Sequence, residues 1–426
     1  MRPRLPDMEM VLNMLVIFAV VGRFFWPLVH SPLDYLWSDP ARHYENAQHF
    51  LEPTFMGSHD PFLYQLYLYL AVTISGDNIT MLNAFCGVLC AFMPLAWFPF
   101  LRRVLPTVWA KAVLLVLAVH PSLWALYGFF MNETLLLVMI GIALSVSFWS
   151  AEKGTKTAFA LAATCWALAS ITRLIALPLG LMVLGYLIWR RRAQYPSRLV
   201  IVLLCFALVL VWPSIHSYRG WHMLKPFGLN EVNTIYAISG AKTVEFHVNS
   251  PQGVFYYIFS SAALYTPGHL QPLSDWQSPR SRMFHFIINP EEGRRDWDRA
   301  LNIAHENPYP YIQQVTDNML TFLFAGPWPD SSYDKKADKV LYINGLLRWG
   351  WAPLILGMAL LFVPFLLARP RQEQLVVVLV TGAMIGAMFL QFTGVMEGRF
   401  RKPLEPLMIT AFAVMLQMIL ARRRKY

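Results

Sequence analysis

The sequence predicts an all-α polytopic membrane protein with about ten transmembrane helices. Charged residues make up 14% of the 426 residues and hydrophobic residues 56%, whereas a soluble domain carries about 25% charged residues. Ten apolar runs reach or approach the roughly 20 residues that a helix needs to cross a bilayer. The alternating apolar and polar segments of an outer-membrane barrel are absent. Helices are therefore expected, because each satisfies its backbone hydrogen bonds internally.

The ten runs have soft boundaries, since several are shorter than a straight span requires. They lie at residues 10–29, 80–100, 109–126, 131–150, 156–172, 174–189, 199–217, 342–367, 374–394 and 403–421. The first run is too long for a secretory signal peptide, and no small-residue cleavage site follows it. We expect it to be the first transmembrane helix.

Positive charge is segregated in a way that predicts topology. If the ten helices alternate from a cytoplasmic N-terminus, the cytoplasmic ends carry basic clusters at 102–103, 190–192 and 422–425. The first outer loop carries a single basic residue, Arg42. This is the positive-inside pattern, with both termini in the cytoplasm. The net charge of +10 thus follows membrane topology and does not indicate a nucleic acid-binding face.

The first outer loop, residues 31–79, contains two short helical patterns at about 40–51 and 61–75. Asp39 followed by Pro40 is a typical helix start, with an acidic N-cap and proline at the first helical position. The second pattern is rich in aromatic residues but too short to cross the membrane. We therefore expect two interfacial helices.

The long segment 218–341 is polar, proline-rich and without cysteine, so it contains no disulfide. Its repeated aromatic residues favour an ordered outer lid over a disordered linker. The predicted organisation is an N-terminal transmembrane core over 1–217, the outer lid over 218–341 and C-terminal transmembrane helices over 342–426.

Ionisable residues gather at the predicted outer ends of the helices, where charges beside hydrocarbon are costly and usually functional. They are Asp39, Arg42, His59, Asp60, Glu133, Arg173, Glu397, Arg399, Arg401 and Lys402. Arginine binds phosphate through its planar fork, and a carboxylate can accept a proton from an attacking hydroxyl. The set indicates an enzyme that uses a lipid-phosphate donor.

Four stretches resemble motifs of the GT-C fold glycosyltransferases. The closest branch includes the bacterial protein O-mannosyltransferases and the lipid A aminoarabinose transferases. In chain order the stretches are SDPARHYENAQHFLE, SHDPFLYQLYLYL, ITRLIALPLGLMVLGYLI and EGRFRKPLEPLMI. The resemblance covers most of the chain and implies a GT-C-like bundle.

The resemblance also implies an activity, namely transfer of a sugar from a polyprenyl-phosphate donor to a glycan, lipid or protein acceptor. The reaction inverts the anomeric centre on the non-cytoplasmic face of the bacterial inner membrane. Asp39 is the expected general base, with Glu133 as a second acid. The expected substrate-binding residues are Arg42, His59, Asp60, Tyr64, Arg173, Glu397 and Arg399.

Three positions depart from the family pattern. Asp60 stands where the family often has lysine, Leu174 where it has proline and Phe400 where it has tyrosine. The first departure removes an expected phosphate contact, for which the remaining candidates are His59, Arg173 and Arg399.

Structural alternatives exist for the same residues. Asp39 is also a natural N-cap, and Arg42 its partner three residues along a helix. Glu133 suits the first turn of a helix, and Arg173 a snorkelling position. Glu397 and Arg399 can pair with each other, and Arg401 and Lys402 are expected to be interfacial anchors.

No cofactor is predicted. His43 and His49 lie on different faces of a helix and do not give a zinc spacing. The remaining metal hypothesis is a divalent cation held by the carboxylates of Asp39 and Glu133.

Two other function classes remain. A transporter or flippase would carry polar or broken helices at mid-membrane and inverted repeats, but the two halves of the chain do not match and Arg23 is its main intramembrane charge. The other class is a non-catalytic partner in surface-polysaccharide assembly. The sequence leaves the sugar, the acceptor and the lipid chain length open.

Overall fold

The computed structural model describes residues 8–36, 38–53, 57, 60–221, 224, 242–244, 270–272, 302, 305–306, 322–323, 338–389 and 401–423. The chain forms two compact units. The first unit comprises residues 1–228, 356–381 and 403–426, and the second comprises 229–355 and 382–402. The last helices are thus divided between the two units.

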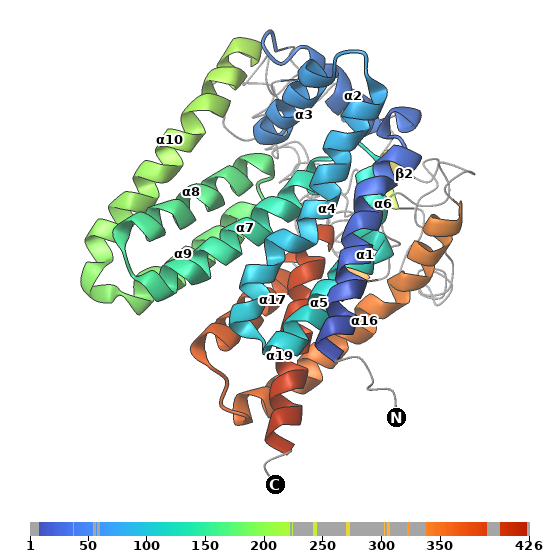
Figure 1. The fold of residues 1–426 in the computed structure, drawn as a ribbon. Helices are drawn as coiled ribbons and strands as arrows, with labels where there is room; N and C mark the ends of the chain where they lie inside the picture. Colours follow the sequence, from blue (N-terminus) through green and yellow to red (C-terminus); the bar gives the residue numbers. More distant parts are fainter. Residues whose placement is uncertain are drawn as a thin grey trace. The chain divides into compact units, whose positions relative to one another are not determined.

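The described residues are almost entirely helical (Figure 1). The N-terminal elements are α1 (Met8–Val29), η1 (Pro32–Tyr35), α2 (Ser38–Gln48), α3 (Phe62–Ser75), α4 (Ile79–Val104), α5 (Thr107–Val119), α6 (Pro121–Ala125), η3 (Leu126–Gly128), α7 (Asn132–Lys153), α8 (Lys156–Thr172), α9 (Ala176–Arg190), η4 (Arg192–Gln194) and α10 (Tyr195–Trp221). The C-terminal elements are α16 (Asp338–Leu367), α17 (Gln372–Phe389), η7 (Lys402–Leu404) and α19 (Glu405–Arg423). In the second unit, β1 (Lys242–Val244) pairs antiparallel with β2 (Leu270–Pro272).

Each of the ten apolar runs predicted from the sequence overlaps a helix, and for the run at 374–394 the structure describes the residues up to 389. Within the described residues, five helices are long and apolar enough to cross a membrane: Glu9–Val29, Ile79–Val104, Asn132–Lys153, Arg192–Gly220 and Lys402–Arg423. A sixth candidate is the pair Thr107–Val119 and Pro121–Gly128, which is bent by 53°. Shorter apolar helices occupy 156–172, 176–190, 351–367 and 372–388. The structure therefore has the helices of a membrane protein.

Helix α7 is the most buried of the five candidate spans, with 78% of its apolar window inside the structure. It packs between α4 and α8, and a tryptophan from each neighbour is fixed to it. The Nε1 atom of Trp97 donates to the carbonyl of Leu137 at 2.9 Å, and that of Trp166 donates to the Ser147 hydroxyl at 2.9 Å. These buried hydrogen bonds set the register of the three helices.

The bend between α5 and α6 is stabilised by a fully buried arginine of α1. Pro121 lacks an amide hydrogen, so the helix breaks there and leaves carbonyls without helical donors. Arg23 donates to the carbonyls of Leu123 at 3.2 Å and of Cys90, on α4, at 2.7 Å. Its guanidinium also lies 5.2 Å from the ring centre of Tyr127. Because Arg23 also donates to the Ala118 carbonyl of α5 at 3.4 Å, its guanidinium is bonded to the backbone on both sides of the break.

Arginines close several helix ends in the first unit. Arg198 donates to the carbonyls of Leu187 at 3.3 Å and Gly154 at 3.1 Å, at the ends of α9 and α7. Arg371 donates to the Val104 carbonyl at 3.3 Å at the end of α4. The Arg422 guanidinium donates to the last residue of α16, Leu367, at 2.6 Å. Cations at helix C-termini satisfy free carbonyls and complement the helix dipole.

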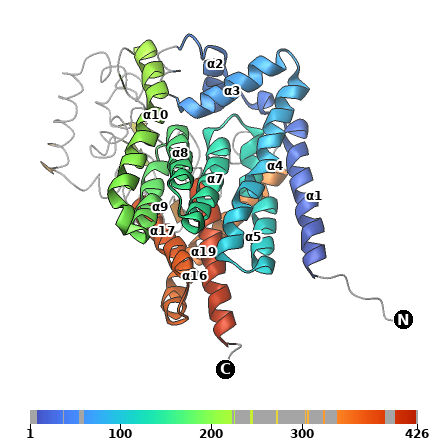
Figure 2. The same ribbon diagram turned by 60° about the vertical axis from the view of Figure 1, so that its left-hand side comes forward.

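Both ends of the first unit's chain lie on the same side. Helix α1 begins and α19 ends at the lower end of Figures 1 and 2, whereas α2 and α3 lie at the upper end. The predicted loop helices are present, although α2 begins at Ser38, slightly earlier than expected. Asp39 consequently lies in the first turn of α2 and not at its N-cap.

Candidate functional site

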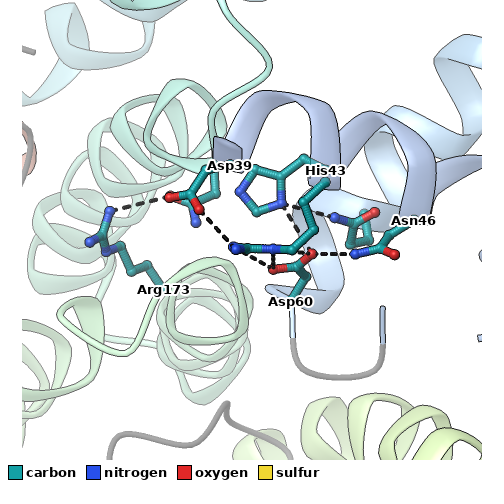
Figure 3. A network of polar contacts seen from close by, with 8 residues as sticks. Asp39, His43, Asn46, Asp60 and Arg173 are labelled. Atoms are coloured by element: carbon teal, nitrogen blue, oxygen red, sulfur yellow. Dashed lines mark hydrogen bonds and ion pairs between the residues drawn. The ribbon is translucent and has the colours of Figure 1, made fainter. Parts of the chain in front are cut away.

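The candidate site is built on one face of α2. Asp39, Arg42, His43 and Asn46 are spaced by three or four residues, which places them on the same side of a helix. Figure 3 shows Asp39, His43 and Asn46 on this face beside Asp60, which lies in the turn before α3, and Arg42 also contacts Asp60. The helix thus presents a row of polar side chains at the end of the first unit opposite to the chain termini (Figure 1).

Aromatic contacts fix α2 in this position. The ring of Tyr44 stacks on Phe130, which directly precedes α7, with centroids 5.2 Å apart and an interplanar angle of 13°. Phe50, at the end of α2, stacks on His216 of α10 at 4.8 Å. The polar face of α2 is therefore held by packing on both sides.

Arg42 bridges two carboxylates. Its Nη1 atom lies 2.8 Å from an Asp39 oxygen, which is the expected i,i+3 pair. Its Nε atom donates to both Asp60 oxygens, at 3.0 and 3.2 Å, and its Nη2 atom lies 3.0 Å from one of them. The Asp60 side chain is 2% exposed, whereas those of Asp39 and Arg42 are 20% and 31% exposed. The bridge therefore has a buried end and an accessible end.

Asp60 has a complete set of protein partners. Asn46 donates to one of its oxygens at 2.6 Å, and His43 Nδ1 lies 3.4 Å from the same oxygen. His43 also contacts Gln65 at 3.1 Å and packs edge-on against the ring of Tyr64. This arrangement turns the Asp60 carboxylate inward, toward the protein.

The surroundings of Asp60 favour its charged form. Burial alone disfavours the carboxylate and raises its pKa, but His43, Arg42 and Asn46 together hold the pKa below its ordinary value of 3.8. Asp60 is therefore an anion at neutral pH, and its charge is matched by neighbouring donors.

A second acid–arginine pair joins α7 to the end of α8. Glu133 lies in the first turn of α7, as expected, and is fully buried. Arg173 is the C-cap residue of α8 and forms an ion pair with a Glu133 oxygen. Its Nη1 atom also donates to the Asn132 side chain at 3.4 Å. The two Glu133 oxygens have no hydrogen-bond partner among the described residues. The ion pair with Arg173 therefore provides the charge that balances the buried carboxylate.

The two pairs face each other. In Figure 3 the guanidinium of Arg173 points toward the carboxylate of Asp39, and the same carboxylate is the ion-pair partner of Arg42. The Arg173 side chain is 23% exposed, so both arginines have accessible surface. Asp39, Arg42, Glu133 and Arg173, which are separate in sequence, therefore converge in one cluster of alternating charge.

Other residues singled out in the sequence are covered by the protein or lie outside the described residues. Tyr64 is 2% exposed and stands behind His43, and the Asp60 carboxylate is likewise covered. Of the predicted substrate-binding residues, His59, Glu397 and Arg399 lie outside the described residues.

The expectation that Arg401 and Lys402 anchor the chain at the membrane interface is wrong, because both are fully buried. The Arg401 guanidinium lies 5.0 Å from the ring centre of Trp351 and donates to the carbonyl of Phe322 within the second unit.

Sequence reasoning missed His43, Asn46 and Asn132 as members of the site. The first two follow Asp39 at the helical intervals of four and seven residues, which is the signal that identifies them. Asn132 was detectable only as the neighbour of Glu133. None of these positions has the spacing of a known metal or nucleophile motif.

The described residues contain no group of three or more His, Cys, Asp or Glu side chains placed to hold a metal ion. The carboxylates of Asp39 and Glu133 each have a guanidinium partner instead. This arrangement offers two partly exposed cations and one partly exposed carboxylate, Asp39, and it suits an anionic ligand that can exchange with that carboxylate.

No family model matches the chain, and no curated protein or solved structure is significantly similar to it.

Proposed function

We propose that the protein transfers a sugar from a polyprenyl-phosphate donor to an acceptor hydroxyl at the non-cytoplasmic face of a bacterial inner membrane. The observation that carries the proposal is the convergence of the pairs Asp39–Arg42 and Glu133–Arg173 at one end of an apolar helical unit. The proposal also includes a GT-C-like bundle of about ten transmembrane helices. It is supported by the helices that overlap the predicted apolar runs, five of which are long and apolar enough to cross a membrane.

The two arginines are suited to the donor phosphate. Guanidinium groups bind phosphate oxygens through paired, charge-assisted hydrogen bonds, and both side chains are partly exposed. Arg173 supplies a second cation beside Asp39, in a chain that has Asp60 where the family pattern has lysine. The leaving polyprenyl phosphate gains negative charge in the transition state, and fixed cations stabilise it there.

Asp39 is the better base of the two acids. Its side chain is 20% exposed, whereas that of Glu133 is fully buried and paired with Arg173. In the proposed reaction the acceptor oxygen forms a bond to the anomeric carbon, and the bond from that carbon to the phosphate oxygen breaks. The electron pair leaves with the phosphate, and the hydroxyl proton passes to Asp39. Displacement in one step inverts the anomeric centre.

Two residues receive different roles from those expected from the sequence. Asp60 is a positioning residue in this proposal, because its buried carboxylate acts through Arg42. Glu133 holds Arg173 and does not itself take a proton from the acceptor. Tyr64 packs behind His43, and the roles of His59, Glu397 and Arg399 in substrate binding remain predictions.

The arrangement of the first unit supports the proposed orientation. Helix α1 begins and α19 ends on one side, and α2 lies on the opposite side (Figures 1 and 2). With basic residues and both termini in the cytoplasm, the cluster around Asp39 faces the periplasmic or extracellular side. A lipid-linked donor in the outer leaflet and an acceptor glycan, lipid or protein can then meet there.

One observation favours membrane transport as a second candidate function. The broken pair α5–α6 contains Ser122, whose hydroxyl donates to Glu405 of α19 at 2.9 Å, and both residues are fully buried. Broken helices and buried acids are features of transporter sites. The same elements also fit a structural role, because Arg23 satisfies the carbonyls at the break.

The deciding experiment is a mass-spectrometric profile of surface glycans, lipids and glycoproteins from a deletion strain. The strain is complemented with wild type, Asp39→Asn or Glu45→Gln at equal expression. Glu45 is an exposed acid on the same helix and serves as the matched control. We expect a sugar-sized mass difference to vanish with Asp39→Asn only. Full complementation by Asp39→Asn would overturn the proposed activity.

A further inference from the structure

We infer that the donor phosphate displaces Asp39 from Arg42, so that donor binding releases the carboxylate that accepts the proton. This inference rests on the proposed function and adds an order of events to it. In this inference Arg42 exchanges its contact with Asp39 for one with the phosphate, while its contact with Asp60 is kept.

The two ends of the Arg42 bridge differ in how firmly they are held. The Nε and Nη2 atoms contact Asp60, whose carboxylate is 2% exposed and also bonded to Asn46. Separating this pair would leave a buried charge without compensation, which is costly. The Nη1 contact with Asp39 at 2.8 Å is an i,i+3 pair between partly exposed side chains. Such pairs contribute little to stability and are readily exchanged.

The Nη1 edge of Arg42 is therefore the position at which a ligand oxygen can enter. A phosphate diester carries one negative charge and can take the place of the Asp39 carboxylate in a charge-assisted hydrogen bond. The inner half of the guanidinium does not need to move, because Asp60 holds it. The phosphate is consequently received by a preorganised donor.

Exchange changes what Asp39 can do. While one of its oxygens is in contact with Arg42 Nη1, that oxygen is blocked from the acceptor hydroxyl. Once the phosphate occupies Nη1, the oxygen becomes available for the proton of the acceptor. Arg173 points toward Asp39 from the opposite side and keeps the carboxylate near the cluster (Figure 3). The base thus becomes available when the donor is in place.

Phosphate binding by purified full-length variants tests this order of events. The ligand is undecaprenyl phosphate in detergent micelles, with undecaprenol in identical micelles as the control for the apolar chain. The variants are Asp39→Asn, Arg42→Gln, the double variant of both and Glu45→Gln, each checked for an unchanged elution profile.

If Asp39 competes with phosphate, Asp39→Asn binds undecaprenyl phosphate about two- to fivefold more tightly than wild type, since exposed ion pairs are worth up to ~1 kcal/mol. Arg42→Gln weakens binding about tenfold or more. In the Arg42→Gln background, the added Asp39→Asn change has no further effect, because the exchange needs Arg42. Glu45→Gln binds like wild type.

Three results would overturn the inference, and they differ in what else they affect. Unchanged or weaker binding by Asp39→Asn, with weaker binding by Arg42→Gln, removes the exchange and leaves the proposed donor intact. Equal tightening by Asp39→Asn with and without Arg42 indicates a general loss of charge repulsion instead of exchange. Equal binding of undecaprenol and undecaprenyl phosphate by wild type rejects the phosphate donor and the exchange together.

Discussion

Arg42 and Asp60 are 18 residues apart, yet the Nε atom of Arg42 donates to both oxygens of the Asp60 carboxylate, at 3.0 and 3.2 Å. The contact joins α2 to the turn that precedes α3 across residues 49–59. It also orients the Nη1 edge of the Arg42 guanidinium, which is the edge that contacts Asp39. The geometry of the candidate site therefore depends on a carboxylate that is itself covered.

Replacing Asp60 by asparagine should destabilise the protein by about 2 kcal/mol, because Arg42 and His43 lose a buried anionic partner. Arg42 is partly exposed, and water compensates part of this loss. Thermal unfolding of the purified protein measures the effect. Asp77→Asn, at an exposed position, is the control and should unfold like wild type. Equal stability of the two variants would contradict the assigned role of Asp60.

The stabilising contribution of Asp60 should depend on pH in the acidic range. Its folded-state pKa lies below the ordinary value of 3.8, so folding favours the charged form. This contribution is fully present above pH ~4 and is lost as the pH falls through the lower, folded-state pKa. We expect the difference in unfolding temperature between wild type and Asp60→Asn to shrink below pH ~4. A difference that is constant from about pH 7 to 3 would exclude this assignment.

Arg173→Gln should lower sugar transfer by about 10- to 100-fold, since a charged hydrogen bond to phosphate is worth ~1.5–3 kcal/mol. Arg173→Lys keeps the charge but loses the fork, and we expect an intermediate rate. The assay is the amount of the Asp39-dependent product in complemented membranes. Arg102→Gln, at an exposed position near the end of α4, is the control. A wild-type rate for Arg173→Gln would remove Arg173 from the site.

Two glycines within helices should respond to alanine in opposite directions. At Gly141 of α7, an added Cβ would lie 2.6 Å from the Trp97 ring, so Gly141→Ala should lower the unfolding temperature. At Gly185 of α9, nothing lies within 4 Å of the added Cβ. Gly185→Ala should therefore stabilise the helix by about 0.5–1 kcal/mol. Similar shifts for both variants would show that α4 and α7 do not approach closely at Gly141.

Glu405→Gln separates the two candidate functions. The amide keeps an acceptor for the Ser122 hydroxyl, so the fold should persist. If the protein is a glycosyltransferase with its site at Asp39, product levels should stay within about twofold of wild type, because the hydrogen bond is preserved. Loss of product with normal expression and normal unfolding temperature would favour a function that uses the buried acid.

The positions of the helices could be predicted from the sequence, but which of them are long enough to cross a membrane could not. Apolar composition predicted helices at the right places along the described chain, because this signal is local. The sequence analysis treated residues 109–126 as one run, whereas the structure bends there at His120–Pro121. A proline in the sequence indicates a break in a helix but does not give the angle of the bend. Helices α8 and α9 are apolar but shorter than the roughly 20 residues of a straight span. Composition therefore does not give the number of membrane spans.

The charged residues of the site, Asp39, Arg42, Glu133 and Arg173, were predictable from the sequence, but most of their partners were not. Asp39 with Arg42 follows from helical spacing, and the structure confirms that pair. The pairing of Glu133 with Arg173 joins the beginning of one helix to the end of the next, which no local pattern encodes. The inward orientation of Asp60 likewise depends on Asn46 and His43, whose contacts arise only after α2 packs against the turn.

The arginines at the helix ends have a consequence for how this protein can evolve. Arg198, Arg371 and Arg422 bond to terminal carbonyls, and in the proposed topology all three lie on the cytoplasmic side, where basic residues set the orientation of a membrane protein. A substitution that weakens the orientation signal therefore also opens a helix end. Inverted topologies, which arise in other membrane proteins by moving a few positive charges, would here require new caps at the same time. In the proposed topology, the residues that set the orientation of the chain are therefore also residues that hold its fold together.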